Sequence, residues 1–399
     1  MSGGKLVALA AATAAAALGI SPASGSPDTV SASAARCKSG AVDAVVAGKR
    51  VCLRRGQRCS KRHDRQYHRH GFHCHTGRLA GGPNPSPPGA LPPAGRVVAT
   101  VPAPSWGGIA VGGGAVWVSN TSRHTVTRVD PQTNAVAATI AIGEPSVDLL
   151  HGPTFLAFGH GTLWVLDGRF TCSCVHRVDP TTNRVVATIP LGVPTQVRIA
   201  PLGIAATADA VWVTNRWGSE AAGDGSVIRI DPQTNEIVAI IGLGSSPETG
   251  GPTGIAAASS AIWVGVPSTK SVVRIDPASN SVVATVPGLF CADGQLAADE
   301  STVWVADCNT VRRIDTRSNA ITKTIPIPGA TGSGVRGIAL ELGVVWAQAG
   351  PLIRIDPSSG AVAGVLPLAP VYVWGEYSIA FGFGSVWVRQ TDAIVRIQP

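Results

Sequence analysis

One short stretch of the chain gathers side chains that either bind metals or form disulfides. Residues 35–78 contain five histidines, and four of the eight cysteines are spaced C-x14-C-x6-C-x14-C within it: Cys37, Cys52, Cys59 and Cys74. Zinc modules usually contain cysteine pairs two to four residues apart, and this stretch has none. We therefore favour disulfides over a zinc site, because so short a segment cannot bury enough apolar core by itself. Four cysteines allow three pairings, among which the spacing does not choose.

The same stretch carries the positive charge of the chain. Residues 35–78 contain twelve Lys and Arg against two Asp, whereas residues 96–399 contain 19 basic and 21 acidic residues. The sequence pI of about 9.3 is therefore a property of the small module. No specific nucleic-acid partner is expected for the rest of the chain. The basic module either binds a polyanion, such as a cell-wall polymer, or presents only a solvated surface.

An Arg-x-Asp signature recurs along the rest of the chain and invites a charge-relay interpretation. Its copies are TRVDP at 127–131, HRVDP at 176–180, IRIDP at 228–232, VRIDP at 273–277, RRIDT at 312–316, IRIDP at 353–357 and, without the acid, VRIQP at 395–399. A pair that is repeated in every unit is typical of a scaffold, so we expect a structural role. The H-E-x-x-H, G-x-S-x-G and P-loop motifs are absent from the sequence.

These signatures belong to a sevenfold repeat. A tryptophan within a short apolar run precedes each signature: Trp117, Trp164, Trp212, Trp263, Trp304, Trp346 and Trp387. Each repeat reads as four strands: a GIA-like run, the tryptophan run, the run ending in Arg-x-Asp, and a VVATI-like run after an Asp-Pro-x-Thr-Asn turn. Four-stranded units of this length, repeated seven times, predict an all-β, seven-bladed β-propeller. The tryptophans are expected to pack between blades.

The two ends of the repeat region predict how the ring closes. The seventh repeat stops at Pro399 before its fourth strand, and the missing strand is found at 96–101, where RVVATV copies RVVATI at 184–189. We therefore expect 96–101 to pair with 394–397, so that the ring has no open edge.

On these residues the chain resembles a known family. The VWVxN core and the RxDPxTNxVVATI segment are similar to the YVTN-type, YncE-like β-propeller repeats of exported bacterial proteins, over all of 96–399. More distantly, the blades resemble virginiamycin B lyase-like and quinoprotein-like propellers. A lyase of that type implies a cluster of histidine, acid and metal in the loops. A quinoprotein implies a pair of adjacent cysteines, which this sequence lacks.

The region before the repeats divides into three parts. Lys5 and the apolar run that follows it predict a signal peptide at 1–34, with cleavage after Ala23 or Ala34. The small disulfide module at 35–78 follows, and 79–95 is a Pro/Gly linker. We expect the mature protein to be secreted or held in the cell envelope, without a membrane span.

The four strands of each blade are called A to D in chain order. Candidate ligand contacts are the side chains that differ between repeats in the D–A and B–C loops. Long insertions occur at 144–154, 192–202, 214–226 and 367–378, and binding sites usually lie on such loops. The expected ligand-binding residues are Arg123, Arg198, Arg216, Trp217, Arg336, Tyr372, Trp374 and Arg389. Cations and aromatic rings suit an anionic or glycan-like ligand.

Two functions remain open. The first is a monomeric binding or scaffold protein without catalysis, metal or cofactor, whose partner is an unknown small molecule, glycan or protein. The second is a metal-assisted lyase or hydrolase that uses His151 with Glu248 or Glu376.

The cysteines of the repeats add one expected disulfide. Cys291 precedes the first strand of the fifth repeat and Cys308 follows its second strand. The start of one strand meets the end of its antiparallel neighbour, so the pair lies within disulfide reach. Whether Cys172 and Cys174 pair with each other is left open.

Overall fold

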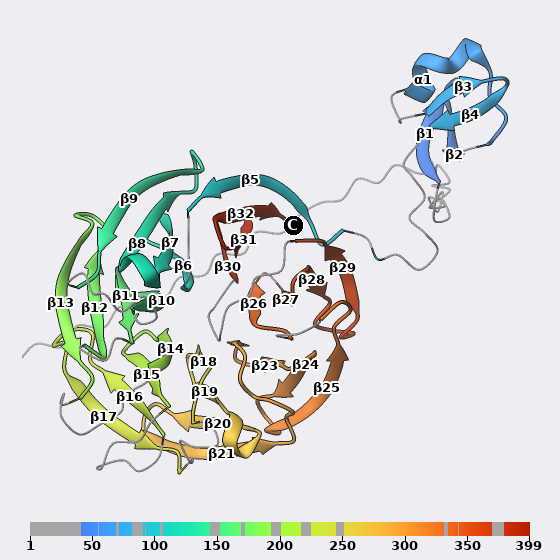
Figure 1. The fold of residues 1–399 in the computed structure, drawn as a ribbon. Coiled ribbons are helices and arrows are strands. Elements are labelled where there is room, and N and C mark those ends of the chain that lie inside the picture. Colours follow the sequence, from blue (N-terminus) through green and yellow to red (C-terminus); the bar gives the residue numbers. More distant parts are fainter. Residues whose placement is uncertain are drawn as a thin grey trace, which may run out of the picture. The chain divides into compact units, whose positions relative to one another are not determined.

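The seven repeats fold into seven four-stranded antiparallel sheets that follow one another around a ring (Figure 1). The computed structural model describes residues 41–54, 56–68, 72–81, 91, 93–103, 107–143, 152–168, 172–192, 201–216, 225–244, 251–330, 334–341, 343–368 and 379–399. The predicted all-β, seven-bladed propeller is confirmed. The predicted signal peptide and Cys37 lie outside the described residues.

Blades 1 to 4 each run from strand A to strand D in chain order. They comprise β6 (Ile109–Gly112), β7 (Ala115–Asn120), β8 (Thr125–Asp130) and β9 (Ala135–Ala141); β10 (Pro153–Gly159), β11 (Thr162–Asp167), β12 (Cys174–Asp179) and β13 (Arg184–Pro190); β14 (Pro201–Ala206), β15 (Val211–Asn215), β16 (Ser226–Ile230) and β17 (Ile237–Gly242); and β18 (Ile255–Ala258), β19 (Ala261–Val266), β20 (Ser271–Asp276) and β21 (Ser281–Pro287).

Blades 5 and 6 follow the same order, and blade 7 takes its strand D from the other end of the repeat region. They comprise β22 (Leu296–Ala298), β23 (Thr302–Asp307), β24 (Thr310–Asp315) and β25 (Ala320–Pro326); β26 (Gly337–Glu341), β27 (Val344–Gln348), β28 (Leu352–Ile355) and β29 (Val362–Leu366); and β30 (Ile379–Gly382), β31 (Ser385–Arg389), β32 (Ala393–Gln398) and β5 (Arg96–Pro102).

The repeated tryptophans form the core between blades. All seven are at most 1% exposed, because strands B and C carry apolar residues on both faces. Each tryptophan packs against the following blade, as Trp164 does against Val211 and Ile228 of blade 3. Trp387 of blade 7 packs in the same way against Val116 of blade 1. The apolar core therefore runs around the whole ring.

Strand β5 closes the ring, as predicted. It pairs antiparallel with β32, with Ala99 opposite Arg396 and Val101 opposite Ile394, and Figure 1 shows the teal strand β5 beside the red strand β32. Val101 is 1% exposed and packs in the cluster that contains Trp387. The first strand of the repeat region is thus an integral part of the last blade.

The preceding residues form a separate unit, since the chain divides into compact units at Met1–Pro87 and Pro88–Pro399. Its elements are β1 (Val42–Val46), β2 (Lys49–Leu53), η1 (Lys61–His63), α1 (Asp64–His68), β3 (Phe72–His75) and β4 (Arg78–Gly81). Strands β1 and β2 form an antiparallel hairpin. Cys59 is bonded to Cys74, and Cys52 is disulfide-bonded as well. Strand β4 extends past residue 78, into the segment 79–95 predicted as a linker.

In the described part of the chain, no helix has the length and the apolar character that crossing a bilayer requires.

Candidate functional site

The ring has two faces with different connections. The turn face carries the A–B and C–D turns, such as 131–134, and the loop face carries the B–C and D–A connections, such as 121–124. Asn134, Asn183, Asn235, Asn280 and Asn319 adopt left-handed backbone conformations in the C–D turns. Asparagine tolerates this conformation better than most residues do, which explains the repeated Asp-Pro-x-Thr-Asn sequence.

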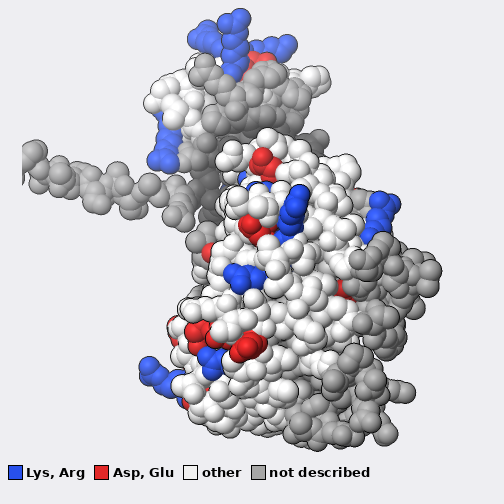
Figure 2. All heavy atoms as spheres, turned by 90° about the vertical axis from the view of Figure 1, so that its left-hand side faces the viewer, with Lys and Arg blue, Asp and Glu red and all other residues white. Residues whose placement is uncertain are grey.

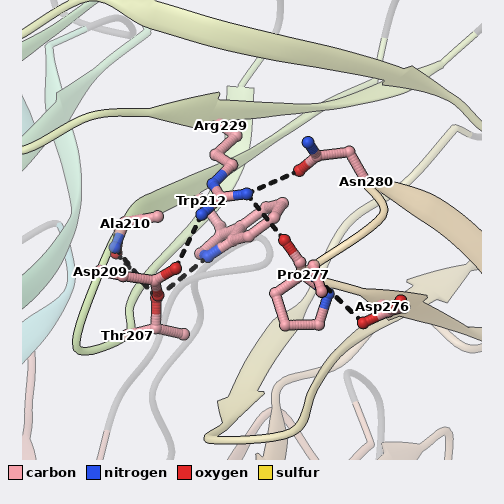
Figure 3. A network of polar contacts seen from close by, with 9 residues as sticks. Thr207, Asp209, Ala210, Trp212, Arg229, Asp276, Pro277 and Asn280 are labelled. Carbon is pink, nitrogen blue, oxygen red and sulfur yellow. Dashed lines mark hydrogen bonds and ion pairs between the residues drawn. The ribbon is translucent and has the colours of Figure 1, made fainter.

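The arginines of five signatures link their own blade to the next one, as Figure 3 shows for blades 3 and 4. The Arg229 guanidinium lies 5.0 Å from the ring centroid of Trp212. Its Nη1 donates to the Pro277 carbonyl oxygen at 2.7 Å and to Asn280 Oδ1 at 2.9 Å, both in the C–D turn of blade 4. Its Nη2 also contacts Asp209 at 2.7 Å. We call this arrangement the latch.

The latch recurs at most seams of the ring. It is made by Arg128 to Pro180 and Asn183, Arg177 to Pro232 and Asn235, Arg274 to Thr316 and Asn319, and Arg396 to Pro131 and Asn134. The latch from Arg396 joins blade 7 to blade 1 and so reinforces ring closure. The signature arginines therefore have the structural role that the repetition predicted.

The seam between blades 5 and 6 departs from this pattern. Gly360 occupies the turn position that asparagine holds elsewhere. Among the described residues, Arg313 contacts the Trp304 ring but makes no side-chain hydrogen bond. Lys323 donates instead to the carbonyl oxygens of Ser358 and Ser359. The glycine in this turn thus removes the side-chain acceptor of the latch.

The aspartates of the signatures shape the turns that follow them. Asp356 accepts from the Ser358 hydroxyl at 2.7 Å and from the Ser358 amide at 2.8 Å. These hydrogen bonds, the hydroxyl first, lower the pKa of Asp356 to about 2. The pKa of Asp130 is lowered in the same way, chiefly by the Gln132 amide. These carboxylates therefore accept hydrogen bonds from residues of their own turns.

A pocket of about 440 Å³ lies on the turn face between blades 4 and 5, and its lining includes Arg274, Glu300 and Arg317. The Glu300 carboxylate accepts from Ser259 and Ser260 of the neighbouring blade. The Ser259 hydroxyl, followed by that of Ser260, lowers the pKa of Glu300. Since Arg274 is engaged in a latch, two of the charged groups of this pocket hold the blades together.

The structure describes four of the predicted ligand-binding residues. Arg123 is exposed at the end of η2 (Thr121–Arg123), and Arg216 is half-buried directly after β15. Arg336 donates to Asp293 Oδ2 at 2.9 Å, which joins the D–A connections of blades 5 and 6. Arg389 is the last residue of β31, at the loop face, and its side chain is fully buried.

The other predicted site residues lie outside the described residues: Arg198, Trp217, Tyr372, Trp374, His151, Glu248 and Glu376.

Arg216 differs from the latch arginines in the hydrogen bonds that it makes. Its Nε is buried without a hydrogen-bond partner. Arg177 and Arg229 also have an unpaired Nε, but their Nη1 atoms are bound in latches. Among the described residues, no acceptor binds the Arg216 guanidinium. Gly251 of the next D–A connection lies so close that a Cβ there would be 2.1 Å from the Arg216 carbonyl oxygen.

The structure also assembles buried polar groups that the sequence analysis did not single out. In blade 2, His176 Nε2 lies 3.2 Å from Asp167 Oδ2, and His176 Nδ1 lies 3.0 Å from Thr188 Oγ1. Cys172 and Cys174 are bonded to each other next to this pair. We call these residues, without Thr188, the blade 2 cluster.

Blade 5 repeats the arrangement with a different base. Arg312 Nε donates to Asp307 Oδ2 at 2.9 Å, and the Asp307 carboxylate also accepts from backbone amides, including that of Cys291 at 2.7 Å. Cys291 is bonded to Cys308 there, the pair that the strand order predicted. Both aspartates stand three residues after the repeated tryptophan, where the other repeats have no acid. Alignment of the repeats by their tryptophans would have revealed both clusters.

Charge on the ring is mixed. Figure 2 shows basic and acidic side chains close to one another on the side it presents, with broad uncharged areas between them. This distribution agrees with the nearly balanced 19 bases and 21 acids of residues 96–399. Among the described residues on that side, the charges do not form the single-sign surface typical of a nucleic-acid interface.

The fold and the latches place the chain in the structural class of seven-bladed β-propellers. Solved structures similar to it include a streptogramin B lyase, with 18% sequence identity, a TM-score of 0.59, and coverage of 74% of this chain and 94% of that one. Another is the hydrazine synthase of Kuenenia stuttgartiensis, with 15% identity, a TM-score of 0.57, and coverage of 74% and 96%. No protein-family model and no curated protein matches the sequence. At these identities, the similarity concerns the fold.

Proposed function

We propose that the chain is an exported β-propeller protein that binds an anionic or glycan-like ligand on its loop face. The observation that carries the proposal is Arg216, a half-buried guanidinium on that face whose Nε has no hydrogen-bond partner. A carboxylate, sulfate or phosphate group would satisfy it with charge-assisted hydrogen bonds. The arginines of five latches, in contrast, are already bound to the turns of the next blade.

The disulfides support the export part of the proposal. The ring contains Cys172–Cys174 and Cys291–Cys308, and the small unit contains Cys59–Cys74. Such bonds persist in oxidising compartments and are rare in the cytosol. The predicted signal peptide at 1–34 leads to the same compartment.

The test measures binding of a carboxylated oligosaccharide, oligogalacturonate, by calorimetry, with neutral maltohexaose as the comparison ligand. Arg216→Met should weaken oligogalacturonate binding by about tenfold, because it removes a hydrogen-bonded charge worth roughly 1.5 kcal/mol or more. The full chain is used, so the basic module contributes equally to every variant. Trp374→Ala should also weaken binding, with little change in melting temperature.

Matched controls lie on the turn face. Arg317→Met removes the same charge from an exposed position in the turn-face pocket, and Gln233→Ala changes an exposed C–D turn residue. Neither should change the affinity. If Arg317→Met weakens binding and Arg216→Met does not, the ligand binds in the turn-face pocket and the assignment of the face is wrong.

The alternative is a metal-assisted lyase or hydrolase on the same face, using His151 with Glu248 or Glu376. It is supported by the similarity in fold to a streptogramin B lyase. The same probe separates the two functions, because a lyase or a hydrolase shortens the oligomer, and eliminative cleavage of a uronate also leaves an unsaturated product that absorbs in the ultraviolet. Turnover that depends on a divalent cation and is lost in His151→Ala would favour the enzyme. Binding without turnover would favour the binding protein.

A further inference from the structure

The blade 2 cluster contains four potential metal ligands of three chemical types. Asp167, His176, Cys172 and Cys174 each offer one ligand atom, and these atoms all lie within 4.8 Å of one another. Ligand atoms around a tetrahedral zinc ion are roughly 3 to 4 Å apart, given Zn–S and Zn–N bonds of about 2.3 and 2.0 Å. Shifts of about 1 Å would therefore bring the four atoms around one ion.

The histidine of the cluster is oriented by a neighbouring strand. Thr188 on β13 lies opposite His176 in the strand register, and its hydroxyl is 3.0 Å from His176 Nδ1. When Nδ1 carries the proton and donates to Thr188 Oγ1, Nε2 directs its lone pair towards Asp167 and Cys174. A hydrogen bond to the second ring nitrogen is the usual way in which proteins orient a metal-binding histidine.

Blade 5 shows what a purely structural version of this site looks like. There Asp307 is neutralised by the permanent charge of Arg312, and three consecutive backbone amides, those of residues 290–292, also bind it. In blade 2 the corresponding base is His176, which offers a lone pair when it is neutral. Asp167 and Cys174 are fully buried, whereas Cys172 is partly exposed and provides a route from solvent.

We propose that reduction of the Cys172–Cys174 disulfide converts the blade 2 cluster into a site for one zinc ion. A thiolate of an external dithiol attacks Cys172 Sγ, the bond between the two cysteines breaks, and Cys174 leaves as a thiolate. The second thiolate of the dithiol then releases Cys172, so the dithiol becomes a cyclic disulfide and its two electrons pass to the protein. Zinc binds both cysteine thiolates, His176 Nε2 and an Asp167 oxygen, and any proton on the two sulfurs goes to solvent.

The thiolates make the proposed site selective for zinc over magnesium or calcium, which prefer oxygen ligands. The disulfide makes it conditional, because two bonded sulfurs are not thiolate ligands. Zinc occupancy of the site would therefore depend on the concentration of reducing thiols around the protein. This proposal does not depend on the ligand proposed for the loop face.

The experiment compares full chains that are reduced with dithiothreitol, freed of it by gel filtration under nitrogen, and titrated with zinc against a chromophoric chelator. Reduced wild type should bind one zinc equivalent more than the Cys172→Ser/Cys174→Ser double variant treated in the same way. This difference cancels any zinc held by the cysteines and histidines of the small unit. Cys291→Ser/Cys308→Ser is the matched control, and it should retain the extra equivalent.

Two further measurements test the ligands and the redox condition. His176→Gln should lower the affinity for the extra zinc equivalent at least tenfold. Cobalt in place of zinc should give a thiolate-to-metal charge-transfer band that the Cys172→Ser/Cys174→Ser variant lacks. If His176→Gln fails to fold, Cys172→Ser, at a partly exposed position, provides the same comparison. Equal zinc content in the reduced wild type and double variant would overturn the proposal. An extra equivalent that unreduced wild type also binds would overturn the redox condition.

Discussion

Replacing Arg229 with methionine should destabilise the ring by about 3 kcal/mol through its hydrogen bonds, in addition to about 1 kcal/mol for the cation–π contact with Trp212. The substitution removes two charge-assisted hydrogen bonds, to the Pro277 carbonyl oxygen and to Asn280 Oδ1. Such bonds contribute roughly 1.5 kcal/mol or more each. The ion pair with Asp209 adds little, because that side chain is 59% exposed. Methionine keeps the apolar contact with Trp212, so the loss reports the polar part of the latch.

The matched substitution is Arg313→Met at the seam between blades 5 and 6. Arg313 also lies over a repeated tryptophan, at 5.9 Å from the ring centroid. Because it makes no side-chain hydrogen bond among the described residues, its replacement should cost only about 1 kcal/mol, the size of a cation–π contact. Urea unfolding followed by tryptophan fluorescence gives both free energies of unfolding from the midpoint and the slope.

A double-mutant cycle isolates the bond itself. Arg229→Met and Asn280→Ala share one hydrogen bond, so their combined cost should fall short of the sum of the single costs by about 1 kcal/mol. Equal costs for Arg229→Met and Arg313→Met, together with no coupling to Asn280, would refute the reasoning. The latches would then be contacts without a measurable effect on stability.

The remaining predictions concern ring closure and the turns. Val101→Ala should lower the free energy of unfolding by about 1 to 2 kcal/mol, because the side chain is 1% exposed beside Trp387. Val98→Ala, at a position 40% exposed on the same strand, should lower it by less than about 0.5 kcal/mol. Equal losses in urea unfolding would contradict the closure by β5. Ser358→Ala should raise the pKa of Asp356 from about 2 towards its ordinary value of 3.8, since the Ser358 hydroxyl is the main cause of the lowering, and carboxyl chemical shifts followed by NMR measure it. Because the pKa of Asp356 is lowered in the folded state, its contribution to stability is fully present above about pH 4 and is lost as the pH falls towards about 2. Ser358→Ala should flatten that part of the dependence of stability on pH. An unchanged dependence would contradict the role given to the Ser358 hydroxyl.

Much of the fold could be predicted because the same sequence pattern recurs in every blade, so that each repeat can be compared with the others. The seven tryptophans locate strand B of every blade, and the copy of the strand D sequence at 96–101 predicts the closing strand. The conformation of Asn134 and its equivalents also follows from local chemistry, because few residues tolerate the left-handed region that the turn requires. These features depend on neighbours in sequence or on comparison between repeats.

The site residues could be predicted only in part. Differences between repeats singled out Arg123, Arg216 and Arg389 alike, but the structure buries Arg389 at the end of β31. Arg336 was expected to be available to a ligand and is paired with Asp293. Whether a cation is free, paired or buried depends on the neighbouring blade, which the sequence of one repeat does not contain.

The sequence by itself therefore determined the architecture of this protein: the strand order, the number of blades, the closing strand and the turn conformations. Only the tertiary structure decided which polar groups meet. Arg229 finds its acceptors in a turn about 50 residues later. His176 on β12 meets Asp167 on β11 and Thr188 on β13, the two neighbouring strands. The physical reason is that these hydrogen bonds depend on strand register and on how adjacent sheets pack, and neither turn chemistry nor the comparison of repeats contains that information.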